Sequence, residues 1–259
     1  MRYLYGFAAA ALAAFSLTCL GQNVVSTDDH YAWSGRLAPG KLLEIKDVNG
    51  VIEATGIAGD TIEIAATKTG RDRDQVRIEQ VETSEGMTFC AVYPGNSCRE
   101  GDHGSNGTHN VKAGVDFVVR IPRNLRFSGF NVNGSVRAEG LGESADARSV
   151  NGNVEVSTSS WARGSSVNGS VRLTMGRADW PDRLKISSVN GSIELELPSD
   201  LNSTVNFKTV NGRIDSEFPL TIQGGFLGRH VSGTVGSGGS RELEVSTVNG
   251  SIHLRKESL

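Results

Sequence analysis

The sequence is poor in aromatic residues, proline and cysteine, and it carries no excess of positive charge. Aromatic residues make up 6% of the 259 residues, and there are six prolines and three cysteines. The formal net charge of −3 gives none of the basic character on which nucleic-acid binding depends. No apolar run after residue 20 is long enough to cross a bilayer as a helix. Nucleic acid is therefore a poor partner, and we expect no transmembrane segment once an N-terminal signal is removed.

Glycine, in contrast, is abundant, with 32 residues. Many glycines with few prolines and aromatics are typical of a turn-rich β-protein rather than a helical one. The hydrophobic fraction of 37% suffices for a core and argues against disorder throughout. The composition therefore favours an all-β protein.

The N-terminus reads as an export signal over residues 1–21. Arg2 is followed by an apolar, alanine-rich stretch from Leu4 to Leu20, and the small residue Gly21 could end it. Cys19 raises lipid anchoring as an alternative, but Thr18 stands where lipoprotein signals carry Gly or Ala. We expect export to the periplasm, the outer membrane surface or the extracellular space, without a lipid anchor.

Two further cysteines, Cys90 and Cys98, lie in the stretch "FCAVYPGNSCRE". An even pair in an exported chain indicates a local disulfide that pins a small loop. The alternative is two free, buried thiols.

The triplet Val-Asn-Gly recurs seven times. It starts at Val48, Val132, Val150, Val167, Val189, Val210 and Val248, with a weakened copy at Val231-Ser232-Gly233. From Val132 the starts step by 18, 17, 22, 21, 21 and 17 residues. Such a period is the signature of a repeat architecture.

Each triplet is flanked by two short alternating segments. With Val as position zero, apolar residues recur at minus five and minus three, and again at plus four and plus six. Each flank is a half-buried strand. Because the apolar positions change from odd to even across the triplet, the chain must bend there. Asn-Gly suits such a bend. The predicted corners, each with an inward valine, are Asn49-Gly50, Asn133-Gly134, Asn151-Gly152, Asn168-Gly169, Asn190-Gly191, Asn211-Gly212 and Asn249-Gly250.

Asn-Gly between alternating segments also fits antiparallel hairpins. Hairpins would not require the same corner at every turn, whereas stacked coils would. We therefore predict an all-β, single-stranded parallel β-helix, or β-solenoid, with about two strands per 17–22-residue coil. Residues 22–125 would form an N-terminal β-region of early, wider coils with a disulfide loop insertion, and residues 126–259 the regular coils, as one continuous domain. A separate small N-terminal β-domain is the alternative for the first region.

The outward plus-five positions suggest a charge column. They are Arg137, Glu155, Arg172 and Glu194, followed by Asp215 and, after the weakened copy, His253. The first four alternate in sign, and we hypothesise that they fix the register of the coils. Ordinary surface charge is the alternative. The corner asparagines would also stack, and stacked amides can bond along the column. The corner asparagines that are followed by Gly-Ser also match the glycosylation acceptor pattern, which tight-turn placement disfavours.

The units "SVNGSV", "TVNGRI" and "TVNGSI", preceded by "VDFVVRIPRNLRFSGFNVNG", resemble the bacterial "putative adhesin" family, a β-helical domain of unknown function. The resemblance covers roughly residues 36–257 and implies an exported envelope or surface protein. "Adhesin" is a label by analogy in that family. The loop between Cys90 and Cys98, with the glycine-rich tract after it, departs from the pattern as an insertion.

The sequence contains no recognisable catalytic arrangement. Asp102, His103 and His109 are a conceivable metal cluster, but no ligand-spacing motif fits and we favour a polar loop. We expect no enzyme, no cofactor and no metal. The sequence predicts a non-catalytic binding, adhesin-like or scaffold module for an unknown envelope or surface ligand, glycan or protein. Self-association through an open terminal coil is a further expectation. The alternative is a carbohydrate-active enzyme on a β-helix scaffold.

Overall fold

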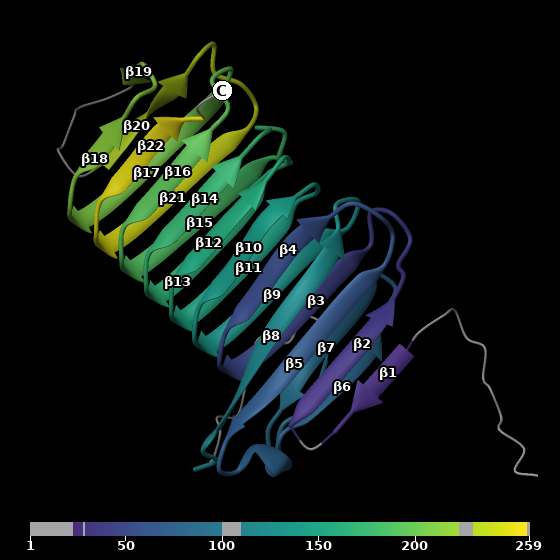
Figure 1. The fold of residues 1–259 in the computed structure, drawn as a ribbon. Helices are drawn as coiled ribbons and strands as arrows, with labels where there is room; N and C mark the ends of the chain where they lie inside the picture. Colours follow the sequence, from purple (N-terminus) through teal and green to yellow (C-terminus); the bar gives the residue numbers. More distant parts are fainter. Residues whose placement is uncertain (1–22, 28, 100–109, 223–229, 258–259) are drawn as a thin grey trace, which may run out of the picture.

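The structure is a computed structural model that describes residues 23–27, 29–99, 110–222 and 230–257. Its strands form two sheets of eleven, named sheet A and sheet B (Figure 1). In spatial order sheet A contains β1 (Asn23–Ser26), β2 (His30–Gly35), β5 (Ile62–Gly70), β8 (Ala113–Pro122), β4 (Ile52–Ile57), β10 (Val136–Leu141), β12 (Val154–Thr158), β14 (Val171–Met175), β16 (Ile193–Leu197), β22 (Ile252–Lys256) and β18 (Ile214–Ser216). Sheet B contains β19 (Leu220–Ile222), β20 (His230–Val235), β17 (Ser203–Asn211), β21 (Glu242–Asn249), β15 (Arg183–Asn190), β13 (Ala162–Asn168), β11 (Ala145–Asn151), β9 (Arg126–Asn133), β3 (Leu42–Asn49), β7 (Gly86–Val92) and β6 (Arg77–Glu82).

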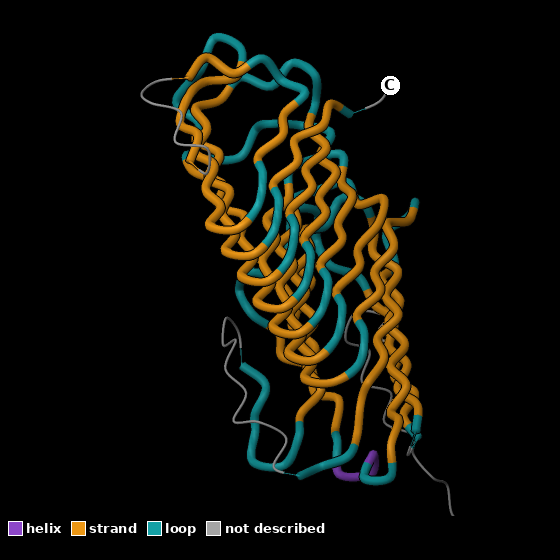
Figure 2. The backbone as a smooth tube through the Cα atoms, turned by 90° about the vertical axis from the view of Figure 1, so that its left-hand side faces the viewer, coloured by secondary structure: helices purple, strands orange, loops and turns teal. Residues whose placement is uncertain are grey.

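The prediction of an all-β chain with large sheets of parallel strands is confirmed. The one helical element among the described residues is a 3-10 turn, η1 (Arg73–Gln75). Each triplet joins a strand of sheet B to the following strand of sheet A, and we call this unit a coil. Neighbouring coils pair in parallel in both sheets, with the corner asparagines in register. Figure 2 shows the corners stacked along one edge of the molecule.

The core lies between the two sheets and follows from the period-two alternation. Within β12, for example, Val154 and Val156 are buried, whereas Glu155 between them points outward. The middle coils bury small residues such as Ala147 and Ala162. Larger side chains fill the core toward the ends of the stack, where Trp33, Phe89, Phe117, Trp180 and Phe207 are buried.

The order of the coils differs from the order of the chain at both ends. The first triplet coil, β3–β4, lies between β7–β8 and β9–β10. The last one, β21–β22, lies between β15–β16 and β17–β18. The prediction that Asp215 follows Glu194 in the charge column, and His253 follows Asp215, is therefore wrong.

Side-chain charges account for the position of the last coil. Between β15 and β21, Arg183 pairs with Glu242 at 2.8 Å and Lys185 with Glu244 at 3.6 Å. If β15–β16 paired directly with β17–β18, Arg183 and Lys185 would lose their acidic partners on β21. Glu194 would also lie beside the carboxylate of Asp215, and two like charges at that spacing repel.

Antiparallel strands cover both ends of the stack. β1, β2, β5 and β6 pair antiparallel at one end, and β19 and β20 at the other. The prediction of wider early coils did not include these strands, although β7–β8 does continue the parallel stack. The weakened triplet at Val231-Ser232-Gly233 is no corner, because it lies inside β20. With Ser in place of Asn it lacks the amide that every other corner uses.

Candidate binding surface

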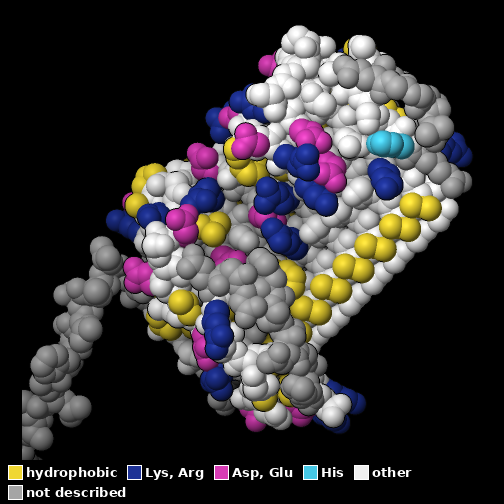
Figure 3. All heavy atoms as spheres, turned by 180° about the vertical axis from the view of Figure 1, so that it is seen from behind, with side chains coloured by type: hydrophobic (Ala, Val, Ile, Leu, Met, Phe, Trp, Pro, Cys, Tyr) yellow, Lys and Arg dark blue, Asp and Glu magenta, His cyan; other side chains and the backbone are white. Residues whose placement is uncertain are grey.

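The valines of the triplets point outward, contrary to the prediction of an inward valine. Val167, Val189, Val210 and Val248 are 40–44% exposed, and only Val48 is buried. The reason is the alternation itself: with minus five and minus three inward, position zero must be outward on the same strand. The valines stack into a row visible in Figure 3, the valine ridge, formed in spatial order by Val132, Val150, Val167, Val189, Val248 and Val210.

The corner asparagines beside the ridge form a continuous ladder of amides. Six of the seven Nδ2 groups donate to the Oδ1 of the asparagine in the neighbouring coil, over bonds of 2.7–2.8 Å, and Asn49 Nδ2 donates to the Ala113 carbonyl at 3.3 Å. The ladder runs in spatial order through Asn49, Asn133, Asn151, Asn168, Asn190, Asn249 and Asn211. Because every step joins a donor to an acceptor of the same residue type, the ladder fixes the register of neighbouring coils.

Five of the seven corner glycines are required for close approach rather than for a left-handed backbone. Gly50 and Gly134 have positive φ, of 134° and 154°, but no described corner asparagine does. A Cβ on Gly152, Gly169 or Gly191 would overlap the carbonyl oxygen of the neighbouring coil's glycine. These carbonyls accept hydrogen bonds of 2.8–2.9 Å from hydroxyls at position minus one, donated by Ser149, Ser166, Ser188, Thr209 and Thr247.

On the outer face of sheet A the plus-five residues form a column along seven coils, and the first five of them alternate in sign. Their spatial order is Glu53, Arg137, Glu155, Arg172, Glu194, His253 and Asp215. Arg137 contacts Glu155 at 2.7 Å and Arg172 contacts Glu194 at 2.8 Å. The late coil thus sets a histidine between two acids, His253 lying 3.3 Å from Asp215. Glu53 went unnoticed in the sequence because its coil lies far upstream of the others.

The same face is hollowed next to this column. A hollow of about 390 Å³ is lined by Thr55, Arg123, Glu139, Ser157 and other residues of four coils, where β10 shifts register between Ala138 and Leu141. Its two carboxylates, Glu139 and Glu155, both face Arg137. They are thus bound in ion pairs of the column rather than directed at a common point in the hollow.

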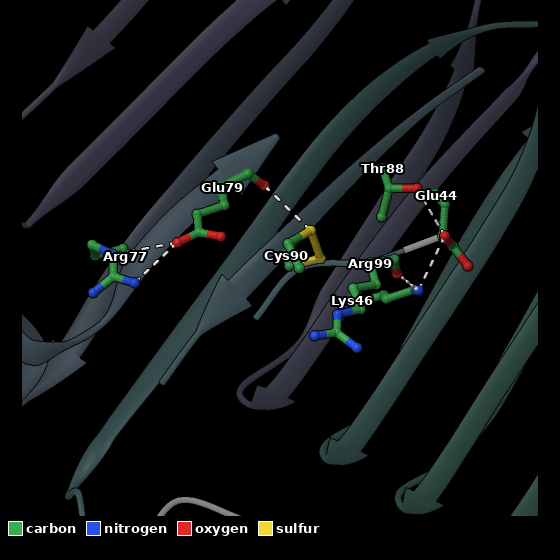
Figure 4. Close-up of a disulfide and its surroundings, with 8 residues drawn as sticks. Glu44, Lys46, Arg77, Glu79, Thr88, Cys90 and Arg99 are labelled. Atoms are coloured by element: carbon green, nitrogen blue, oxygen red, sulfur yellow. Dashed lines mark hydrogen bonds and ion pairs between the residues drawn. A yellow bond between two sulfur atoms is a disulfide. The ribbon is translucent and has the colours of Figure 1, made fainter. Parts of the chain in front are cut away.

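Cys90 and Cys98 are joined in a disulfide, as predicted (Figure 4). It holds the segment after β7 over the outer face of sheet B. Under this segment Lys46 donates to the Arg99 carbonyl at 2.6 Å and lies 3.3 Å from Glu44. The Thr88 hydroxyl donates to Glu44 at 2.9 Å, so the buried ion pair has further polar partners. The disulfide therefore secures a cover over charged groups that would otherwise face solvent.

A second buried polar group lies at the first corner. Asp47 and Asn131 occupy position minus one, where later coils have a hydroxyl, and both are buried. Asn131 Nδ2 lies 3.4 Å from Asp47 Oδ2, while Oδ1 of each residue has no partner within the described chain. Burial, with the nearby charge of Asp116, raises the pKa of Asp47 well above its ordinary value.

Other predicted features lie outside the described residues: the signal segment 1–21, Cys19, and the cluster of Asp102, His103 and His109. Within the described ranges, no group of three or more His, Cys, Asp and Glu residues is placed to hold a metal ion. No helix there is long and apolar enough to cross a membrane.

No family model matches the chain, and no curated protein matches it. Among solved structures it is similar to a "putative cell adhesion protein" from Clostridium sporogenes, with a TM-score of 0.47 and 10% identity over 87% of this chain and 99% of that one. It is also similar to a "putative adhesin" from Bacteroides fragilis, with a TM-score of 0.32 and 11% identity over 88% and 98% of the two chains. The family resemblance drawn from the Val-Asn-Gly motifs stays a prediction.

Proposed function

We propose that the chain is an exported β-solenoid of the cell envelope that acts as a non-catalytic binding, adhesin-like or scaffold module. The observation that carries the proposal is the repetition of one surface along the stack: six coils present the same valine ridge and the same amide ladder. A catalytic site needs different groups that converge on one reacting atom. A repeated edge instead suits an extended partner, or a rigid spacer between other components.

Two further observations support export and rigidity. The Cys90–Cys98 disulfide is of the kind that persists in oxidising compartments. The corner polar groups bond from coil to coil, because Gly134 and Gly169 donate their N–H to the Asn151 and Asn190 carbonyls at 3.0 Å. These bonds hold each corner in register with the next one.

The test combines localisation with binding. Cell fractionation should place the protein outside the cytoplasm, and the purified chain without residues 1–21 should bind envelope fractions saturably. The same protein, unfolded in urea and diluted at the time of the assay, is the control. Retention in the cytoplasm would contradict export. Turnover of a bound glycan would contradict a non-catalytic role and favour the carbohydrate-active enzyme.

A further inference from the structure

Each of the seven corners contains an Asn-Gly pair, the dipeptide most prone to spontaneous deamidation. In that reaction the backbone nitrogen of the glycine attacks the side-chain Cγ of the asparagine before it. Glycine favours the attack because it has no Cβ to hinder the nitrogen and its backbone rotates freely. An eighth pair, Asn106-Gly107, lies outside the described residues. Since the seven corner pairs are chemically alike, the structure around each of them decides which can react.

Hydrogen bonds hold the reacting groups apart at an interior corner such as Asn190-Gly191. The asparagine is held twice, because its Nδ2 donates to Asn168 at 2.8 Å and its Oδ1 accepts from Asn249 at 2.7 Å. The glycine is held once, because its N–H donates to the Asn249 carbonyl at 3.0 Å. All three bonds must break before the side chain can turn and the nitrogen can reach Cγ. The stack therefore protects this pair.

The Asn211-Gly212 corner differs because it ends the ladder. Asn211 Nδ2 donates to Asn249 Oδ1 at 2.7 Å, but within the described chain nothing donates to Asn211 Oδ1. The Gly212 N–H also has no acceptor there, since the strand beyond β17 is the antiparallel β20, which brings no corner. Asn211 is exposed as well. One bond holds this corner, whereas two hold Asn151 and three hold each of the other five.

We propose that Asn211 is a site of spontaneous deamidation in the folded protein. The Gly212 nitrogen forms a bond to Asn211 Cγ and the Cγ–Nδ2 bond breaks. The amide group leaves as ammonia and takes with it the proton of the glycine N–H. Water then opens the resulting succinimide ring at one of its two carbonyls, which leaves aspartate or isoaspartate at position 211. The reaction needs no reagent other than water.

The product changes the last coil of the stack. A carboxylate has no hydrogen to donate to Asn249 Oδ1, so the ladder loses its final step. Isoaspartate also adds a methylene group to the main chain between β17 and β18, the two strands that meet at this corner. The modification therefore acts on one end of the stack and leaves the other six corners intact.

The experiment incubates the purified chain without residues 1–21 at mildly alkaline pH and follows each corner asparagine by peptide mass spectrometry. One hydrogen bond contributes about a fivefold factor to an equilibrium, so Asn211, with two fewer bonds, should deamidate about 25 times faster than Asn190. In guanidinium chloride, which removes all these bonds, the two rates should come within a few-fold of each other. Equal rates in the folded protein, or faster conversion of an interior corner, would overturn the proposal.

A variant of the ladder tests the cause. Asn249→Ala removes the one bond that holds Asn211 and one of the three that hold Asn190, so both should deamidate about fivefold faster. Asn124→Ala, at an exposed asparagine outside the ladder, is the matched control and should leave both rates unchanged. Circular dichroism establishes that both variants are folded. Unchanged rates in Asn249→Ala would overturn the proposal, because the hydrogen bonds would then not control the reaction.

Discussion

Removing the last coil should release the coil that precedes it in the chain. The change is a truncation after Ser240, which deletes β21 and β22. If coils stacked in chain order, this deletion would shorten the stack by its outermost unit. In the observed order it removes an internal unit, and β17 loses the parallel neighbour with which it pairs from Thr204 to Asn211.

The size of the effect follows from burial. Leu243, Val245, Ile252 and Leu254 are 0–1% exposed. At about 2 kcal/mol for each buried aliphatic side chain, the deletion removes about 8 kcal/mol. The whole unfolding free energy of a domain is about 5–15 kcal/mol. The segment Ser203–Val235 should therefore detach, while the coils from β3 to β16 keep their mutual contacts.

Hydrogen exchange and limited proteolysis, both read by mass spectrometry, measure this directly. β17 and β20 should exchange rapidly and become cleavable in the truncated protein, whereas β9 to β14 stay protected as in the full chain. Protection of Ser203–Asn211 in the truncated protein would refute the reasoning, because β17 would then pair with β15 without the charges of β21.

Three further changes test the corners and the charge column. Gly169→Ala should lower the free energy of unfolding in urea by about 2–3 kcal/mol, because the added methyl overlaps the carbonyl of the neighbouring corner. In the control Gly239→Ala, the nearest atom to the added methyl lies at 3.6 Å, and the loss should be under ~0.5 kcal/mol. Arg172→Glu should lower the free energy of unfolding by about 1 kcal/mol at low salt and by less at high salt, because it places three carboxylates in a row. Arg177→Glu is the control, because its acidic partner Asp179 lies in its own loop. An equal loss of stability in the two variants would contradict a role for the column. The pKa of Asp47 is raised in the folded state, so its contribution to stability is complete below its ordinary pKa of ~3.8 and is lost as pH rises toward the folded value. Asp47→Asn should therefore flatten the decline in stability above pH ~4, measured by urea unfolding from pH 3 to 8. An unchanged pH profile would show that Asp47 is not the group responsible.

The strands and corners could be predicted from the sequence because both depend on local rules. Alternation defined each flank, and the change of phase across the triplet required the bend that Asn133-Gly134 and its equivalents make. The outward direction of Val167 follows from the same alternation, because position zero lies on the opposite side of the strand from the buried positions minus five and minus three. The prediction of an inward valine contradicted that pattern. The disulfide followed from the even pair of cysteines in an exported chain.

The order of the coils could not be predicted, and the reason is the repeat itself. Identical corners bond equally well to any neighbour, since an amide ladder and a glycine carbonyl do not distinguish one coil from another. The coils differ in a few surface side chains, such as His253, which faces Glu194 in place of Asp215. Each such cross-strand pair changes the stability by a few tenths of a kcal/mol to about one. Ser187 and Ser246, which are far apart in the sequence, likewise become neighbours only in the folded chain.

The exchanged coils have a consequence for how the chain acquires its structure in time. A polypeptide that emerges with its N-terminus first delivers β17 before β21, and delivers β3 before either of its neighbours in sheet B. At the N-terminal end β7–β8 and β9–β10 can each add to β3–β4 as they appear, whereas at the C-terminal end β17–β18 appears before the coil with which it pairs. Closing the C-terminal end depends on contacts between segments distant in the sequence, which form slowly. The C-terminal end of the stack therefore reaches its final arrangement only after β21 and β22 have been made.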